Sequence, residues 1–233
     1  MADHAEALED FNRDVFSGRV FEARESRLRK ALEMFESEQA CGRVLDVAAG
    51  SGIASEALGH AGWTVSALDL SESLIQQVRA RGIDDAQVHK IGSGPLPFSN
   101  DTFDGVFAGE IIEHLVDTRA FVLDITRVLK PGGVVVLTTP NLASLENRAR
   151  LLLGIYPIWV EYELSSQGHV RAYTKRTLTR QLRSCGLTVE SVKGNWVPFL
   201  PQAVVHDVRV PALARTGDWL PSLSQGLIVK ARK

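Results

Sequence analysis

The feature that most constrains the fold is an alternation of short β-branched runs with helical patterns, which begins at Arg43. In chain order, the β-branched runs read RVLDVAA, WTVSALDL, AQVHKIG, FDGVFAG and GVVVLTT. One helix between them is predicted in SESLIQQVRARG, where Ser71 suits an N-cap and Gly82 a C-terminal stop. Another is predicted in DTRAFVLDITRVLKPGG, whose apolar residues recur on one helical face. This alternation predicts an α/β protein with a doubly wound, mostly parallel sheet covered by helices on both faces.

Three parts of the chain outside this alternation are expected to cover the sheet. Residues 1–40 read as N-terminal helices that cover the site, ahead of one domain at 41–233. Within that domain, residues 140–170 and 194–221 are expected to be insertions over the working edge of the sheet, where they cover the acceptor. The insertions are rich in aromatic residues, namely Tyr156, Trp159, Tyr162, Trp196 and Phe199. These rings either wall an aromatic acceptor or form a small core of the cover itself.

Composition limits the partners and the setting of this chain of 233 residues. A formal net charge of −2 provides no broad basic surface for nucleic acid, so the expected partner is a small molecule. No apolar run reaches the roughly 18 residues that span a bilayer, and the acidic start MADHAEALED lacks the features of a signal peptide. The only cysteines, Cys41 and Cys185, are far apart, which favours a reducing, cytoplasmic setting. The sequence leaves the oligomeric state open.

The run VLDVAAGSG at 44–52 predicts a strand that leads through a glycine turn into a helix. Gly50 and Gly52 carry no Cβ, so the backbone can approach a ligand closely. The next strand ends in ALDL, which places Asp69 to accept hydrogen bonds from two ribose hydroxyls. The alternative is a glycine turn and a helix-capping aspartate without a ligand. Because the two features fall at corresponding ends of consecutive strands, a nucleoside site is favoured.

The glycine turn favours a nucleoside without phosphates. A dinucleotide fingerprint needs G-x-G-x-x-G, but the chain reads GSGIAS from Gly50, with Ser55 in place of the third glycine. A phosphate-binding loop would need a Lys-Ser or Lys-Thr pair, and this turn has neither.

Four motifs in order resemble those of class I S-adenosylmethionine-dependent methyltransferases, over about residues 40–190. VLDVAAGSG resembles the first motif and ALDL the acidic second. PLPFSNDTFDGVFAGEIIEHL resembles the stretch through the fourth strand, and LKPGGVVVLTTPN the fifth strand and its approach. Within the family, the chain resembles the ubiquinone-biosynthesis O-methyltransferase-like group (methyltransferase types 11 and 23). The resemblance implies S-adenosylmethionine as the methyl donor and a Rossmann-like, seven-stranded sheet whose last strand, GLIVKAR, runs antiparallel to the rest.

The resemblance also implies a set of cofactor-binding positions, with two departures from the family. Ala48 stands where the family usually has the first glycine of its loop, and Gly92 where an acid usually meets the adenine amino group. Adenine would then be held by backbone groups near Ser93 and by packing against Leu70 and Leu115. The implied cofactor-binding positions are Asp46, Ala48, Gly50, Gly52, Asp69, Leu70, Gly92, Ser93 and Gly109.

The sequence GEIIEH at 109–114 places two carboxylates and an imidazole directly after a buried strand. If residues 110–115 form a helical turn, Glu110, Glu113 and His114 fall on one side and the apolar residues on the other. Charged groups are costly inside a fold unless they are paired or bind something, so the polar side is expected to face the cavity. The motif alone allows two interpretations. The three residues bind a metal ion, or they order the backbone and His114 acts as a base.

A later histidine, His169 in QGHVRAYTKRTLTRQL, strengthens the metal hypothesis. Ubiquinone O-methyltransferases and small-RNA 2′-O-methyltransferases, which this pairing resembles, join Glu-x-x-Glu-His to a later ligand, and a divalent ion holds the acceptor hydroxyls. The resemblance implies Glu110, Glu113, His114 and His169 as ligands of Mg²⁺, Mn²⁺, Zn²⁺ or Fe²⁺. Two imidazoles suit the last three at least as well as Mg²⁺. Without a metal, His114 or His169 is the expected catalytic base, and a His169 that only anchors the loop is the structural alternative.

These observations predict an S-adenosylmethionine-dependent methyltransferase that methylates a small-molecule hydroxyl with the help of a divalent metal. One alternative is a metal-independent N- or C-methyltransferase that acts on a sugar or a lipid-linked intermediate. Another is a non-catalytic protein that binds adenosylmethionine. An NAD-dependent oxidoreductase is disfavoured by the missing third glycine.

Overall fold

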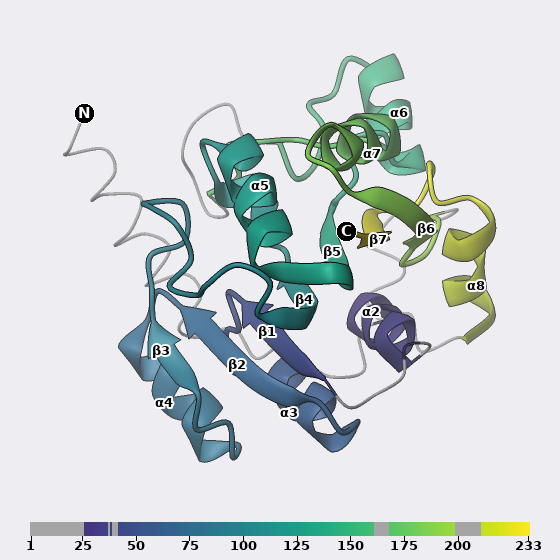
Figure 1. Ribbon diagram of the computed structural model, residues 1–233. Helices are drawn as coiled ribbons and strands as arrows, with labels where there is room; N and C mark the ends of the chain where they lie inside the picture. The colour runs from purple at the N-terminus through teal and green to yellow at the C-terminus, as the bar shows by residue number, and fades with distance from the viewer. Residues whose placement is uncertain (1–25, 37, 39–41, 161–167, 199–210) are drawn as a thin grey trace.

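The alternation that begins at Arg43 forms a mostly parallel sheet, as predicted (Figure 1). The computed structural model describes residues 26–36, 38, 42–160, 168–198 and 211–233, and within them the sheet has seven strands. The strands are β1 (Arg43–Val47), β2 (Thr64–Asp69), β3 (Ala86–Val88), β4 (Phe103–Gly109), β5 (Leu129–Pro140), β6 (Thr188–Gly194) and β7 (Gly226–Arg232). None of the helices in these residues is long and apolar enough to span a bilayer.

The strand order is β3-β2-β1-β4-β5-β7-β6. Strands β1 to β5 pair in parallel, and β7 lies antiparallel between β5 and β6. This is the Rossmann-like arrangement that the resemblance implied, including the antiparallel last strand. The chain moves outward in one direction from β1 to β3 and in the other from β4 to β5. The order therefore reverses between β1 and β4, and ligands of such sheets bind at the carboxyl ends of the strands at this point.

Alternating side chains along the strands supply two separate cores, one on each face of the sheet. Leu45 and Val106 belong to the core that also holds Phe121 of α5 and Leu178 of α7. Their strand neighbours, such as Val44, point to the opposite core, beneath α2, α3 and α4. Because successive side chains of a strand point to opposite faces, strands buried on both faces read as continuous apolar runs.

Helices form after the glycine turn and in the two runs between strands, as predicted. The helices are α2 (Ser26–Glu36), α3 (Ile53–His60), α4 (Glu72–Ala80), α5 (Thr118–Val128), α6 (Leu145–Leu152), α7 (Lys175–Ser184) and α8 (Pro211–Trp219), with a short 3-10 helix η1 (Ile112–His114). Helix α4 begins directly after Ser71, and Gly82 beyond its end has the left-handed φ of 85°. Helix α7 begins with a capping box formed by Thr174 and Thr177.

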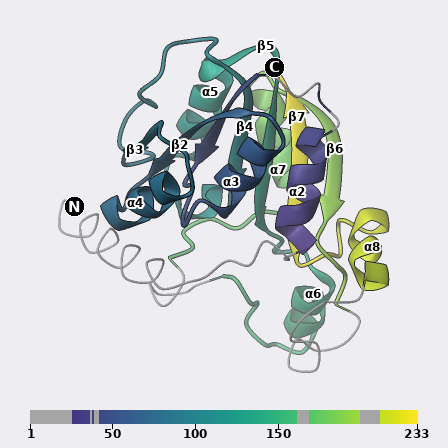
Figure 2. The ribbon, with the colours of Figure 1, turned by 90° about the horizontal axis from the view of Figure 1, so that it is seen from below.

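Helix α8 lies within residues 194–221, the second predicted covering segment, for which no helix was predicted. Gly217 lets this helix lie close to the end of β6, because an added Cβ would stand 2.3 Å from the Gly194 carbonyl oxygen. Seen from below, α6 and α8 extend beyond one end of the sheet (Figure 2).

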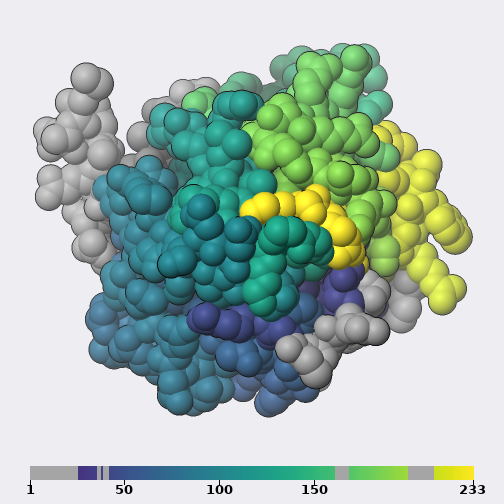
Figure 3. All heavy atoms as spheres, viewed as in Figure 1, coloured from purple at the N-terminus to yellow at the C-terminus, as the bar shows by residue number. Residues whose placement is uncertain are grey.

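The C-terminal residue pairs with the segment near the start of β5. In the space-filling view, the last residues of the chain lie against the segment that opens β5 (Figure 3). The Lys233 N–H donates to the Gly133 carbonyl oxygen at 3.0 Å, and the Gly132 N–H donates to the Lys233 carbonyl oxygen at 3.1 Å. Residues 1–25, most of the predicted N-terminal helices, fall outside the described residues, whereas α2 packs beside α3 against β5 and β7. The proposed domain boundaries stay a prediction.

A buried lysine ties α2 to α8. Lys30 is 2% exposed, and its ammonium group donates to the carbonyl oxygens of Gly194 at 2.7 Å and Ala214 at 2.5 Å. It also donates to the Asp218 carboxylate at 2.8 Å. Burial lowers the pKa of Lys30, and the Asp218 carboxylate opposes that shift. The ammonium group therefore satisfies acceptors from two segments that lie more than 160 residues away in the sequence.

We expect Lys30→Met to lower the free energy of unfolding by about 2–4 kcal/mol, because methionine fills the space of the stem but leaves these acceptors without their donor. Arg29→Met on the same helix changes an exposed i,i+4 pair and should cost about 0.5 kcal/mol or less. Urea denaturation of both variants checks this. Equal, small losses would mean that the Lys30 bonds contribute little net stability.

Candidate functional site

The predicted glycine turn connects β1 to α3 and has an unusual backbone. Ala48, Gly50 and Gly52 have φ angles of 63°, 54° and 81°, all in the left-handed region. For alanine this conformation costs about 1–2 kcal/mol, so Ala48 keeps the backbone of the glycine that the family usually has there. Such strain persists where the surrounding structure enforces it, commonly at functional sites.

The two glycines of the turn have different roles. A Cβ added at Gly50 would meet no protein atom within 4 Å. A Cβ added at Gly52 would lie 3.1 Å from the Cα of Val78 in α4. Gly52 therefore permits close packing of α3 against α4, whereas Gly50 leaves space on the side that a ligand would use.

Asp69 joins the end of β2 to the glycine turn. Its carboxylate accepts the Gly50 N–H at 2.9 Å through Oδ2 and the Ser71 N–H at 3.0 Å through Oδ1. The side chain is 7% exposed, and burial raises the pKa of Asp69. Each carboxylate oxygen has a second lone pair, so the group can still accept hydrogen bonds from ribose hydroxyls. Asp69 is thus held in place before any ligand binds.

Asp46 of β1 lies beneath the same turn. It is 1% exposed and accepts a 2.6 Å hydrogen bond from the Ser55 hydroxyl. Ser55 stands where a dinucleotide fingerprint has its third glycine, and its hydroxyl instead satisfies the buried acid. Burial is the main cause that raises the pKa of Asp46 to about 7, and the nearby Asp69 adds to the shift.

The remaining predicted cofactor positions follow β2, β3 and β4 at the same edge. Gly92 has a φ of 87°, and an added Cβ would lie 3.1 Å from Leu115 Cδ2, which places these two residues in contact. Ser93 is exposed and donates to the Lys90 carbonyl oxygen. Gly109 ends β4, where a side chain would collide with the Phe107 ring. Leu70 directly follows β2 and is partly buried.

The two glutamates of GEIIEH are each held by a threonine at the end of β5. Glu110 has a φ of 53°, so the helical turn begins only at Ile112 and is shorter than the predicted turn over 110–115. The Thr138 hydroxyl donates to Glu110 Oε1 at 2.8 Å, and the Thr139 hydroxyl donates to Glu113 Oε2 at 3.0 Å. Since β4 and β5 are parallel neighbours, these four residues meet at their carboxyl ends.

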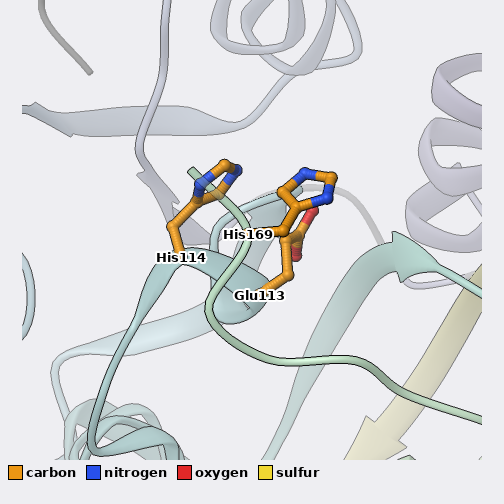
Figure 4. Close-up of side chains that lie close together, drawn as sticks. All are labelled: Glu113, His114 and His169. Atoms are coloured by element: carbon orange, nitrogen blue, oxygen red, sulfur yellow. The ribbon is translucent and has the colours of Figure 1, made fainter. Parts of the chain in front are cut away.

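The structure brings His169 to this site although it lies 55 residues after His114 in the sequence. The backbone N–H groups of Val170 and Arg171 both donate to the Glu113 carbonyl oxygen at 2.9 Å. The imidazole rings of His114 and His169 lie 4.8 Å apart, centroid to centroid. Figure 4 shows the Glu113 carboxylate directed toward the His169 ring. Among the described residues, Glu113, His114 and His169 offer ligand atoms within 4.8 Å of one another.

Hydrogen bonds to the backbone fix the tautomers of both imidazoles. Nδ1 of His114 lies 3.1 Å from the Gly168 carbonyl oxygen, and Nδ1 of His169 lies 3.1 Å from the Trp159 carbonyl oxygen. A carbonyl oxygen only accepts, so each neutral imidazole carries its proton on Nδ1. Nε2 is then the nitrogen that can accept a proton or bind a metal. Histidines that bind metals usually make such a second hydrogen bond.

Glu113 also fits a cationic partner. It is 1% exposed, and its Oε1 has no hydrogen-bond partner among the described residues. Burial and then the nearby Glu110 carboxylate raise the pKa of Glu113 well above its ordinary value. A buried acceptor without a partner is costly, and a bound cation would satisfy it. The three residues therefore fit a divalent metal ion in number, type and supporting bonds.

Glu110, the fourth predicted ligand, binds other side chains instead. Its Oε2 forms a 2.6 Å ion pair with Arg27 of α2, while Oε1 accepts the Thr138 hydroxyl. Glu110 is not part of the three-residue group, although its charge acts on Glu113. The predicted cluster is thus three residues that converge and a neighbouring carboxylate that another cation neutralises.

A small cavity opens beside Glu113. Its other lining residues come from the end of β5 and from both sides of the first insertion, namely Thr139, Pro140, Leu142, Trp159, Val160, Arg171 and Ala172. Of the predicted aromatic wall, Trp159 lines this cavity, Tyr156 is 47% exposed, and Trp196 is buried. Tyr162 and Phe199 fall outside the described residues. The acceptor-covering role of the insertions stays a prediction.

Sequence reasoning missed three polar partners of the site. Thr138 and Thr139 end the LTTP run, and their place at the carboxyl end of a predicted strand could have indicated them. Arg27 gave no signal, because it lies 83 residues before Glu110 in a segment predicted only to be helical.

The raised pKa of Asp46 predicts a dependence of stability on pH. The folded carboxyl keeps its proton up to about pH 7, while the unfolded one releases it near its ordinary value of about 4. The stability from Asp46 is therefore full below about pH 4 and is lost as pH rises toward 7. We expect Asp46→Asn to remove this decline, a difference on the order of a few kcal/mol between pH 5 and 8.

Urea denaturation of wild type and Asp46→Asn at several pH values between 5 and 8 measures the difference. Asp104→Asn is the control, because the pKa of Asp104 is lowered and its linked stability is lost only in more acidic solution. Parallel pH profiles for wild type and Asp46→Asn would show that Asp46 stays ionised throughout this range.

Comparison with known proteins places these observations in a family. A family model described as a methyltransferase domain matches residues 20–192. A ubiquinone biosynthesis O-methyltransferase from Xanthomonas oryzae pv. oryzae is 32% identical over 161 residues, which cover 65% of each chain. The chain thus spans slightly less than two thirds of that relative's length. A demethylmenaquinone methyltransferase from Clavibacter sepedonicus is 38% identical over 97 residues, covering 41% of this chain and 40% of the relative.

Among solved structures, an S-adenosylmethionine-dependent methyltransferase from Mesorhizobium loti superposes with a TM-score of 0.61 at 22% identity. The match covers 88% of this chain and 96% of that one. At this identity the likeness concerns the fold alone.

Proposed function

We propose that this chain, which belongs to the class I S-adenosylmethionine-dependent methyltransferases, transfers a methyl group to a hydroxyl oxygen of a small-molecule acceptor. S-adenosylmethionine supplies the activated methyl group. The protein must then bind this donor, align the acceptor oxygen with it and remove the hydroxyl proton.

The residues at the ends of β1 and β2 fit the donor. Asp69 is fixed by the N–H groups of Gly50 and Ser71 and can accept hydrogen bonds from the ribose hydroxyls. The space beside Gly50 lets backbone and ligand approach closely. Gly92 and Leu115, which contact each other, give the adenine an apolar surface in place of the missing acid.

The observation that carries the acceptor proposal is the convergence of Glu113, His114 and His169 at the carboxyl end of β4. A divalent cation bound there would lower the pKa of the acceptor hydroxyl and orient it. A carboxylate and two imidazoles suit Mn²⁺, Fe²⁺ or Zn²⁺ at least as well as Mg²⁺. Without a metal, Nε2 of His114 or His169 is the nitrogen that would accept the hydroxyl proton, because each Nδ1 donates to a backbone carbonyl oxygen.

A second candidate is methyl transfer without a metal, to carbon or nitrogen. The similarity to a demethylmenaquinone methyltransferase supports it, and so does the pairing of Glu110 with an arginine. In that case His114 or His169 acts as the base alone, and Glu113 orders the segment that carries His169. Dependence on a divalent ion separates the two candidates.

For the donor site, we expect Asp69→Ala to weaken S-adenosylhomocysteine binding by roughly 1.5–3 kcal/mol, the usual range for hydrogen bonds to a charged group. Gly50→Leu should abolish binding, because the side chain enters the space left for the ligand. Gly82→Leu is the matched control. It has the same left-handed backbone and open surroundings but lies at the end of α4. Calorimetry checks all three, and equal losses at Gly50 and Gly82 would attribute the effect to backbone strain.

For the metal, we expect chelation with EDTA to abolish methyl transfer, and Mn²⁺, Zn²⁺, Fe²⁺ or Mg²⁺ to restore it. Glu113→Gln and His169→Ala should each lower metal affinity at least tenfold while S-adenosylhomocysteine affinity stays within twofold. The two sites occupy different strand ends and share no ligand. Full activity after exhaustive chelation would reject the metal and leave the histidines as bases.

The acceptor class is tested by the release of S-adenosylhomocysteine with matched small aromatics. We expect turnover with a compound that carries two adjacent hydroxyls and none with its fully O-methylated form. Turnover with the matching amine but not the hydroxyl compound would favour the second candidate. Tight donor binding without turnover on any acceptor class would indicate a non-catalytic binding protein.

A further inference from the structure

Glu110 is held in a conformation that is costly to keep. Its φ of 53° lies in the left-handed region, which is unfavourable for a residue with a Cβ. Both oxygens of its carboxylate are engaged, Oε1 by the Thr138 hydroxyl and Oε2 by the Arg27 guanidinium. Strain of this kind is maintained by the surroundings and concentrates at functional sites. The Glu110 carboxylate is therefore held by two specific contacts, one to β5 and one to α2.

Arg27 lies at the start of the described part of α2. Its guanidinium pairs with the Glu110 carboxylate at 2.6 Å, with both side chains 22% exposed. The ion pair thus connects the start of α2 to the carboxyl end of β4, 83 residues further along the chain.

Two carboxylates so close together need positive charge. Glu113 is buried, and the Glu110 charge disfavours its ionised form. The described structure places one cation on Glu110, the Arg27 guanidinium, and leaves Oε1 of Glu113 without a partner. With Arg27 and Thr138 in place, Glu110 is directed to α2 and stays outside the three-residue group.

We propose that Arg27 is the internal countercharge of Glu110 and that it exchanges with the divalent ion of the acceptor site. An ion held by Glu113, His114 and His169 would compete with Arg27 for Glu110 and would release the start of α2. Metal binding and docking of α2 therefore oppose each other. Arg27 is a positioning residue, because its guanidinium pairs with Glu110 and lies outside the three-residue group. This inference rests on the metal site of the proposed function.

The proposal is tested in the full chain with Mn²⁺ titrations of Arg27→Gln, Glu110→Gln and the double variant. We expect Arg27→Gln to bind Mn²⁺ about tenfold more tightly than wild type, since Glu110 is then available as a fourth ligand. In the Glu110→Gln background, the same change should alter the affinity less than twofold. Arg27→Lys keeps the charge and should stay within threefold of wild type. Arg29→Gln removes an equal charge from the same helix without touching Glu110 and should have no effect.

Hydrogen exchange of the α2 amides is a second measurement. A long-range effect of charge alone would not change it. In metal-free protein, Arg27→Gln and Glu110→Gln should each speed exchange in α2, with no further increase in the double variant. Saturating Mn²⁺ should speed exchange in wild type but leave it unchanged in Glu110→Gln.

The outcomes test the competition between Arg27 and the metal ion separately from the metal site itself. If Arg27→Gln raises the Mn²⁺ affinity equally in wild type and in Glu110→Gln, Arg27 acts only as a distant charge and the proposal is wrong. Mn²⁺ binding to wild type with unchanged or slower exchange in α2 would overturn it while leaving the metal site standing. If no variant binds Mn²⁺, both the exchange and the metal part of the proposed function fail.

Discussion

The parallel pairing of β1, β2, β4 and β5 is the constraint on which both sites depend. Parallel strands end at the same edge, where the chain leaves the sheet and polar side chains can gather. At this edge Asp69 of β2 accepts the N–H of Gly50 in the turn after β1. Two strands further along the sheet from β1, the Thr138 and Thr139 hydroxyls of β5 donate to Glu110 and Glu113, which follow β4. The reversal of strand order between β1 and β4 sets these two groups next to each other, so a donor and an acceptor can meet there.

Several residues at this edge lower the free energy of unfolding. Ala48 and Glu110 adopt left-handed backbone conformations that are costly for residues with a Cβ. Asp46, Asp69 and Glu113 are buried acids whose pKa values are raised, mainly because burial disfavours the charged form. The two cores beneath the edge bury many apolar side chains, and this burial offsets the cost. Strained backbone and buried charge concentrated at one edge are typical of a site arranged for a ligand.

Helix α2 connects distant parts of the chain through two charged side chains. Lys30 binds the end of β6 and α8, and Arg27 binds Glu110 at the end of β4. The first bond is buried and satisfies backbone acceptors, so its role is structural. The second is partly exposed and meets a carboxylate beside Glu113, where we propose that a bound cation competes with it. A single short helix thus carries one buried anchor and one partly exposed ion pair.

The sequence by itself determined the mostly parallel sheet, because apolar periodicity and glycine turns are local signals. The antiparallel last strand was implied only by the family resemblance. The sequence also indicated Asp69 and the Glu113–His114 pair, since strand ends can be read from the chain. Only the tertiary structure decided that Glu110 faces Arg27 rather than the histidines, and that Ser55 satisfies Asp46. It also revealed α8, whose nine residues hold against β6 through close packing at Gly217 rather than through a strong helical pattern. Contacts between residues far apart in the chain depend on how helices and strands pack against one another. No local sequence pattern specifies that packing.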